Sequence, residues 1–247
     1  MTGAALPEPS GPSGPAGLSA LAADRRRAVL RQSLSVGLAT GAYGISFGAL
    51  SVAAGLSLWQ TMALSLLLFS GGSQFALVGI VAAGGSGVAA VATSSLLGVR
   101  NGLYGLQVSR LLGVHGARRA AAAQLTIDES TAVAVGQPEL PASRLGFWAT
   151  GLAVFALWNL TTVVGALIGD LLGDPKRYGL DAAAAAAFCA LLWPRLRNGE
   201  TRAVAGAAAL AALLIAPHAP AGVPVLVAAL AAVVAGLRRP RTPEAGR

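Results

Sequence analysis

The sequence predicts an all-α, polytopic integral membrane protein with about six to seven transmembrane helices, and three observations support this fold class. Hydrophobic residues make up 55% of the chain, and the mean hydropathy is +0.66. Charged residues make up only 11%, against about 25% in a typical soluble domain. The 68 residues between Arg31 and Arg100 include no Asp, Glu, Lys, Arg or His, whereas one membrane-spanning helix needs about 20 such residues.

The net charge of +8 is concentrated beside the apolar blocks, which is typical of the cytoplasmic flanks of membrane spans. We therefore expect no nucleic-acid partner, and a multi-pass protein of the cell (inner) membrane with both termini in the cytoplasm. The transmembrane domain is predicted at 31–239, between a disordered tail at 1–30 and a short tail at 240–247. The basic residues are Arg25, Arg26, Arg27 and Arg31 before the first apolar block and Arg238, Arg239 and Arg241 after the last.

Uncharged runs predict the individual spans. The segment 110–144 is mixed in character, and we expect it on the cytoplasmic side because it is rich in arginine. An even number of crossings must then precede it, although three apolar segments do. One of these three is therefore predicted to be broken or re-entrant, which leaves six full crossings. The runs lie at about 33–54, 58–83, 88–106, 145–169 and 178–194, followed by two short helices in 203–237 hinged at 217–220.

The broken segment is predicted in the stretch LLLFSGGSQFALVGI, residues 66–80. The pair Gly71-Gly72 favours interruption of the helix, and Ser70, Ser73 and Gln74 carry groups that satisfy freed backbone atoms. Transporters place such breaks at their substrate sites. Small residues also let membrane helices pack closely, and Ser or Gln can hydrogen-bond between helices. The residues alone leave both alternatives, a packing surface and a binding site, open.

Charged residues at two further positions also allow two interpretations each. Arg100, followed by Asn101, is either close enough to a helix end to reach the headgroups or deeper, where it needs an anion as partner. Thr126 and Glu129 have the spacing of a helix capping box. That interpretation leaves Asp128 without a role. The two carboxylates could instead form an ion pair with an arginine inside the membrane or bind a proton during transport.

The remaining polar residues predict structural roles. Trp158 lies in the middle of a span and is expected to pack against other helices, and Asp181 is expected to cap a helix. Neither His115 nor His218 has neighbours at metal-ligand spacing, so we expect no metal and no cofactor. No P-loop motif occurs, which favours ion coupling over ATP use for any transport against a gradient.

Five stretches, taken together, resemble the AzlC family, the large subunits of bacterial branched-chain amino acid exporters. The resemblance covers about residues 33–215, and the chain departs from it in its Pro/Gly-rich tail and in Asn101, where histidine is common. The stretches are GISFGALSVAAGLSLWQTMALSLLLFSGGSQFALVGI, LLGVRNGLYGLQVSRLL, LTIDESTAVA, WNLTTVVGALIG and YGLDAAAAAAFCALLWP.

This resemblance implies a secondary transporter, not an enzyme, that exports branched-chain or related amino acids and works with a small AzlD-type membrane subunit. It also favours a binding site at the predicted break. The helix N-terminus and Arg100 would receive the substrate carboxylate, and Asp128 would meet the ammonium group or carry a coupling proton. Phe75 and neighbouring Leu and Val side chains would surround the branched side chain, and the amide of Gln74 would face a wet cavity. The site residues implied are Gly71, Gly72, Ser73, Gln74, Arg100, Asn101 and Asp128.

Two other functional classes stay open. Gly71-Gly72-Ser73 looks like part of a serine hydrolase site, with His218 as the base, although Gln74 stands where a glycine is expected. A channel is the third alternative, and saturable, substrate-specific efflux distinguishes a transporter from it.

Overall fold

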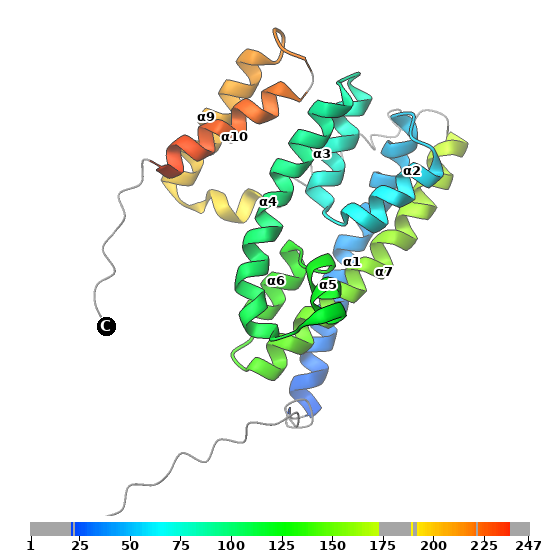
Figure 1. The fold of residues 1–247 in the computed structure, drawn as a ribbon, viewed down its shortest axis with the longest axis vertical. Coiled ribbons are helices and arrows are strands. Elements are labelled where there is room, and N and C mark those ends of the chain that lie inside the picture. Colours follow the sequence, from blue (N-terminus) through cyan, green and yellow to red (C-terminus); the bar gives the residue numbers. More distant parts are fainter. Residues whose placement is uncertain (1–20, 22, 173–188, 190–191, 221, 238–247) are drawn as a thin grey trace, which may run out of the picture.

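The structure, a computed structural model, describes residues 21, 23–172, 189, 192–220 and 222–237 (Figure 1). Within these residues the chain is helical and has no β-strand, so the predicted all-α class is confirmed for this part. Two of the described helices, α1 and α7, are long and apolar enough to cross a membrane. The number of spans, six to seven, stays a prediction.

Helices α1 (Ala23–Ala53) and α7 (Leu140–Leu172) lie side by side and form the frame of the protein (Figure 1). Small residues let membrane helices approach closely, and glycines recur along the face of α1 that meets α7. A Cβ atom at Gly48 would collide with the carbonyl oxygen of Thr162. These contact glycines of α1 are Gly37, Gly41, Gly44 and Gly48.

The boundaries of these two helices differ from the predicted ones. Helix α1 begins at Ala23, so the arginine triplet lies in its first turns and the predicted tail boundary at residue 30 falls inside a helix. Helix α7 contains the whole predicted span 145–169 and extends it at both ends. In both cases the helix continues beyond the end of its apolar run.

The predicted break in the second apolar segment is present. Helix α2 (Leu58–Ala63) continues as a π-helical segment, Leu64–Leu68, and ends before Phe69. Helix α3 (Gly71–Ala82) then begins after the N-cap Ser70 and runs back toward the end from which α2 came (Figure 1). The segment 58–83 is therefore not one span but a re-entrant pair of short helices.

A second re-entrant pair occurs where the sequence predicted a cytoplasmic segment. Helix α4 (Gly87–Leu112) runs antiparallel to α1 (Figure 1). Helix α5 (Gly116–Gln124) then returns toward the middle of the bundle, and α6 (Asp128–Val135) leaves it again. Part of the segment 110–144 therefore enters the bundle, where Asp128 pairs with Arg100 of α4, whereas Arg110, Arg118 and Arg119 are exposed.

The order of a long helix, a short helix, a break and a short helix thus occurs twice, in opposite directions (Figure 1). The first residues of α3 and α6, Gly71 and Asp128, are 57 positions apart. The same offset relates identical residues at several places, as expected for two repeats of inverted topology. These pairs are Gly41 and Gly98, Gly48 and Gly105, and Ser73 and Ser130.

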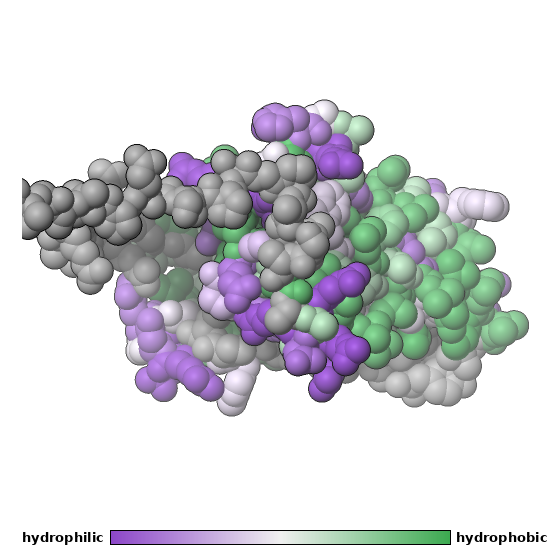
Figure 2. Space-filling view, turned by 90° about the horizontal axis from the view of Figure 1, so that it is seen from below, coloured by the Kyte–Doolittle hydropathy of each residue, from purple (hydrophilic) through white to green (hydrophobic). Residues whose placement is uncertain are grey.

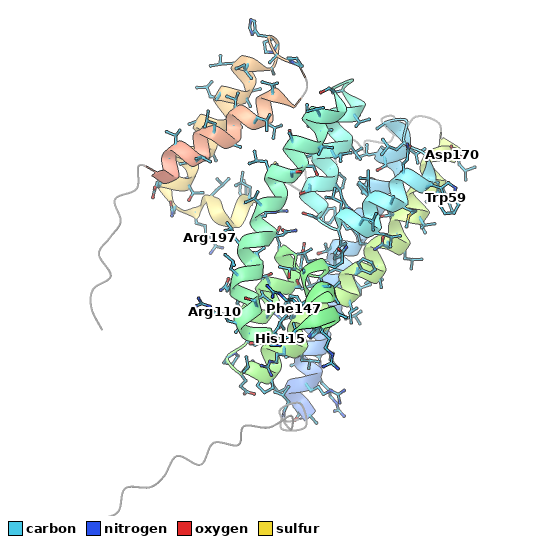
Figure 3. All side chains as sticks on the ribbon, in the orientation of Figure 1. Trp59, Arg110, His115, Phe147, Asp170 and Arg197 are labelled. Atoms are coloured by element: carbon cyan, nitrogen blue, oxygen red, sulfur yellow. The ribbon has the colours of Figure 1, made fainter. Side chains whose placement is uncertain are left out.

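Hydrophilic side chains gather at one end of the bundle, and hydrophobic ones cover a flank beside it (Figure 2). At this end lie the start of α1 and the α4–α5 connection, with Arg110 and His115 (Figure 3). Trp59 and Asp170 lie at the opposite end. The arginines of the N-terminus and of the segment 110–144 therefore share one end, as their charge predicted.

The C-terminal part forms a helical hairpin. A 3-10 helix, Trp193–Arg197, precedes α9 (Gly199–Ile215), which packs against α10 (Val223–Leu237). The hinge predicted at 217–220 falls in the turn between these two helices. Most of the predicted span 178–194, including the predicted cap Asp181, lies outside the described residues.

Substituting Gly48→Leu should weaken the pairing of α1 with α7, because the new side chain has no room beside the Thr162 carbonyl. Overpacking of this kind costs about 1–3 kcal/mol. The thermal unfolding midpoint in detergent should fall, together with the amount of protein inserted in the membrane. The matched control is Gly79→Leu in α3, where an added Cβ meets nothing within 4 Å. Equal midpoints for the two variants would contradict the packing role of the α1 glycines.

Candidate functional site

A cavity of about 190 Å³ lies where the two breaks meet. One water occupies about 30 Å³ of liquid volume, so the cavity has room for a small solute. Residues of α1, α3, α4, α6 and α7 and of both breaks line it. The first two residues of α3 and of α6 line it, and both helices begin midway along the bundle (Figure 1).

The N-terminus of α3 reaches the cavity without a side-chain cap. Its N-cap residue, Ser70, donates its hydroxyl to the Ser73 hydroxyl at 3.2 Å and makes no capping bond to a backbone N–H. The first N–H groups of a helix have no partner within the helix, and the positive end of the helix dipole favours an anion there. Gly71 and Gly72 line the cavity and add no side chain that would cover these N–H groups.

Aromatic rings form the wall beside this helix start. Trp158 is 4% exposed, and its ring stacks on Phe47 with centroids 5.9 Å apart. Phe75 meets the same indole edge-on at 6.1 Å. A Cβ at Gly71 would come within 3.3 Å of the indole, so glycine allows the close approach of α3. The prediction that Trp158 packs is confirmed, and the residue also lines the cavity.

Arg100 in α4 pairs with Asp128 in α6 across the cavity, with Nη1 and Oδ2 2.9 Å apart. The interpretation of Arg100 as a residue reaching the headgroups is therefore wrong, because its guanidinium has an internal carboxylate partner. The pair uses one atom of each group. The Arg100 Nε and the Asp128 Oδ1 are buried and have no hydrogen-bond partner among the described residues.

Two more cavity residues each have a buried polar atom without a hydrogen-bond partner among the described residues. The Asn101 Oδ1 and the Trp158 Nε1 lack a partner within the described part of the chain. Buried polar groups normally have a hydrogen-bond partner, and a site with several that do not has capacity for a polar ligand or water. Donors and acceptors are both available here, as recognition of a zwitterion requires.

Helix α6 begins differently from the predicted capping box. Its N-cap is Ile127, and the Thr126 hydroxyl donates instead to the Ala122 carbonyl at 2.7 Å. Ser130 takes the capping role, because its hydroxyl accepts from the Ile127 N–H and donates to the Leu125 carbonyl. Glu129 is thereby free to line the cavity beside Asp128. The capping interpretation missed Glu129, although two adjacent carboxylates at a helix start were a visible signal.

Gln74 holds the first break together. It is fully buried, and its Nε2 donates to the Leu64 carbonyl at 3.0 Å. The prediction that its amide faces a wet cavity is wrong, because the amide nitrogen donates to backbone carbonyls of the π-helical segment, to Leu64 and, at 3.5 Å, to Ser65. Ser73 is also fully buried, and neither residue lines the cavity. Of the seven implied site residues, Gly71, Gly72, Arg100, Asn101 and Asp128 do line it.

The structure also places residues of α1 in the cavity that the sequence did not single out. Thr40 and Tyr43 line it from this side. Tyr43 stands 57 positions before Arg100, the offset that separates the two helix starts. Comparing the sequences of the two halves at this offset would therefore have identified Tyr43 as a candidate site residue.

The residues of the hydrolase alternative are not brought together. The Ser73 hydroxyl accepts from Ser70 in a fully buried position. His218 is exposed in the α9–α10 turn, with its Nδ1 3.3 Å from the Leu214 carbonyl oxygen. A nucleophile and its base need to be within hydrogen-bonding distance, so this geometry does not favour the hydrolase.

Replacing Gln74 by leucine should destabilise the protein, because it keeps the bulk but removes the hydrogen bonds that the amide donates to the Leu64 and Ser65 carbonyls. An unsatisfied buried group costs about 1–3 kcal/mol, so the thermal unfolding midpoint in detergent should fall. Gln107→Leu is the control, since Gln107 is an exposed residue of α4 outside the cavity. A Gln74→Leu protein with the parental midpoint but no transport would instead restore a direct role in substrate binding.

Comparison with known proteins agrees with the position of the cavity. The family model described as AzlC protein matches residues 35–172, which is more than half of the chain. This range includes every residue that lines the cavity and excludes α9 and α10. No curated protein and no solved structure matches the chain. The chain belongs to the AzlC family and is a membrane protein with a role in transport.

Proposed function

We propose that this protein is a secondary transporter that exports branched-chain or related amino acids. One observation carries the proposal: an incompletely paired arginine and aspartate meet an uncapped helix N-terminus beside an apolar wall. These are the groups that a zwitterionic amino acid with an apolar side chain requires. Transporters place broken helices of this kind at their substrate sites.

Each part of the substrate has a partner in the cavity. The carboxylate binds at the N–H groups of Gly71 and Gly72 and at the Nε of Arg100, which has no hydrogen-bond partner among the residues that the structure describes. The ammonium group binds at the free Oδ1 of Asp128. When the zwitterion binds, its carboxylate lies beside Arg100 and its ammonium group beside Asp128. Each member of the existing ion pair thus gains a partner of opposite charge.

The apolar lining supports a branched side chain. Phe69, Phe75, Ile127 and Val154 contribute aromatic and aliphatic surface to the cavity. A hydrophobic pocket separates side chains that differ by one methylene by only about 1–3 kcal/mol. Leucine, isoleucine and valine are therefore expected to compete for the site.

The wider setting of transport follows from the family and the sequence. Export against a gradient is ion-coupled, since the chain contains no P-loop motif. A small AzlD-type membrane subunit is the expected partner, and the cell (inner) membrane is the expected location. A channel is the second alternative, and saturation of transport distinguishes the two.

Counterflow in vesicles tests the proposal. Vesicles that contain the chain, with and without a small AzlD-type subunit, should take up labelled leucine and valine in exchange for unlabelled substrate. Arg100→Gln and Asp128→Asn should each abolish this uptake, because each leaves one charge of the pair unbalanced. Arg110→Gln is the matched control, since Arg110 is an exposed arginine in the last turn of the same helix. Parental uptake by Asp128→Asn would contradict the assigned site.

Cysteine labelling tests the orientation. In a chain whose Cys189 has been replaced by serine, a membrane-impermeant reagent added outside should label a cysteine at Gly85, between α3 and α4. It should not label a cysteine at Arg118, because this position lies in the arginine-rich end that we place in the cytoplasm. External labelling at 118 without labelling at 85 would reverse the orientation.

A further inference from the structure

Glu129 is the charged side chain of the cavity that the ion pair does not use. Arg100 pairs with Asp128, and Glu129 makes no ion pair within the described part of the chain. When both carboxylates are ionised, the cavity carries one more negative than positive charge. Binding of a single proton makes it neutral.

The fold holds Glu129 in this position. It is the second residue of α6, where the positive end of the helix dipole stabilises a carboxylate. Ser130 provides the cap of α6, and the Glu129 carboxyl interacts with its own backbone N–H. Thr40 of α1 lines the cavity together with Glu129. Carboxylates that face an interior cavity of a membrane protein are typical of proton relays.

The two inverted halves differ in charge at equivalent positions. The positions that correspond to Arg100, Asp128 and Glu129 in the first half are occupied by uncharged residues, Tyr43, Gly71 and Gly72. Around Glu129, α1 contributes Thr40 and Tyr43, α3 contributes glycines and Phe75, α4 contributes Arg100 and Asn101, and α7 contributes Val154 and Trp158. The charged neighbours in this lining are Arg100 and Asp128, which already pair with each other.

We propose that Glu129 is the proton-binding residue that couples export to the proton gradient, an inference that rests on the proposed transport function. Glu129 takes a proton from the outer aqueous phase and releases it to the cytoplasm, while the amino acid moves in the opposite direction. Ionised Glu129 leaves the cavity negative and favours the substrate ammonium group. Its protonation removes that attraction, and the substrate leaves. Asp128 is less suited to this role, because its charge is balanced by Arg100.

Vesicles that contain the full chain test the coupling. In the parental protein, an imposed pH gradient should drive uphill movement of labelled leucine or valine, and a pH-sensitive dye should report a matching proton flux. The apparent KM for exchange should rise as the pH falls. In Glu129→Gln, the side chain is permanently uncharged, so exchange should show a raised apparent KM that no longer varies with pH. Gradient-driven transport by this variant should fall to the level of vesicles without protein.

Matched variants make the outcome specific. Glu139→Gln removes an exposed carboxylate just before α7, outside the cavity, and should behave as the parent. Glu129→Asp should retain coupling with a shifted pH profile. Parental proton flux in Glu129→Gln would overturn the proposal, as would coupling of the parental chain to sodium instead of protons. If Glu129→Gln does not reach the membrane, an unshifted profile for Glu129→Asp overturns it. Absence of any leucine or valine exchange by the parental chain would contradict the transport function itself.

Discussion

The structure depends on satisfying backbone groups that two chain breaks free inside an apolar bundle. Non-helical backbone at membrane depth is tolerated only where protein or a water-filled cavity covers it. At the first break the Gln74 amide donates to the Leu64 carbonyl, and at the second the Ser130 hydroxyl donates to the Leu125 carbonyl. Each of these side chains comes from the first turns of the helix that follows the break. The same hydrogen bonds therefore stabilise each break and hold the N-termini of α3 and α6 beside the cavity.

The two helix starts have the same geometry but different chemistry. Helix α3 begins with glycines and no side-chain cap, so its N–H groups remain available to an anion. Helix α6 begins with Asp128 and Glu129, so its own carboxylates already occupy the favourable end of its dipole. One half of an inverted pair can thus receive an anionic group while the other presents negative charge. A zwitterion needs an anion-binding group and a negative charge together. The ion pair of Arg100 with Asp128 lies at the start of α6, where this negative charge is.

Composition and charge order were enough to predict the helical class, the membrane setting and a break in the second apolar segment, which lies just before Gly71. These features depend on local sequence and on the arginine distribution. The position of Gln74 was not predictable in this way, because its partners, the Leu64 and Ser65 carbonyls, belong to a π-helical segment that the sequence pattern does not indicate. The entry of Asp128 into the bundle was not predictable for a related reason. The charges of the segment 110–144 suggest water when counted singly, whereas Asp128 is balanced by Arg100 from a different helix. Charge pairing between helices distant in sequence has no signature in hydropathy.

A hydrogen bond and a shared apolar core join the two re-entrant pairs. Gln124, at the end of α5, donates to the Leu66 carbonyl at 2.8 Å in an exposed position. Separating the pairs at this point costs one interhelical hydrogen bond, about 0.6 kcal/mol on average in membrane proteins. Opening either break would instead leave a buried carbonyl unsatisfied, at a cost of about 1–3 kcal/mol. The hydrogen bonds therefore resist opening of either break more than separation at Gln124. The helix starts that line the cavity are held by the same bonds that close the breaks.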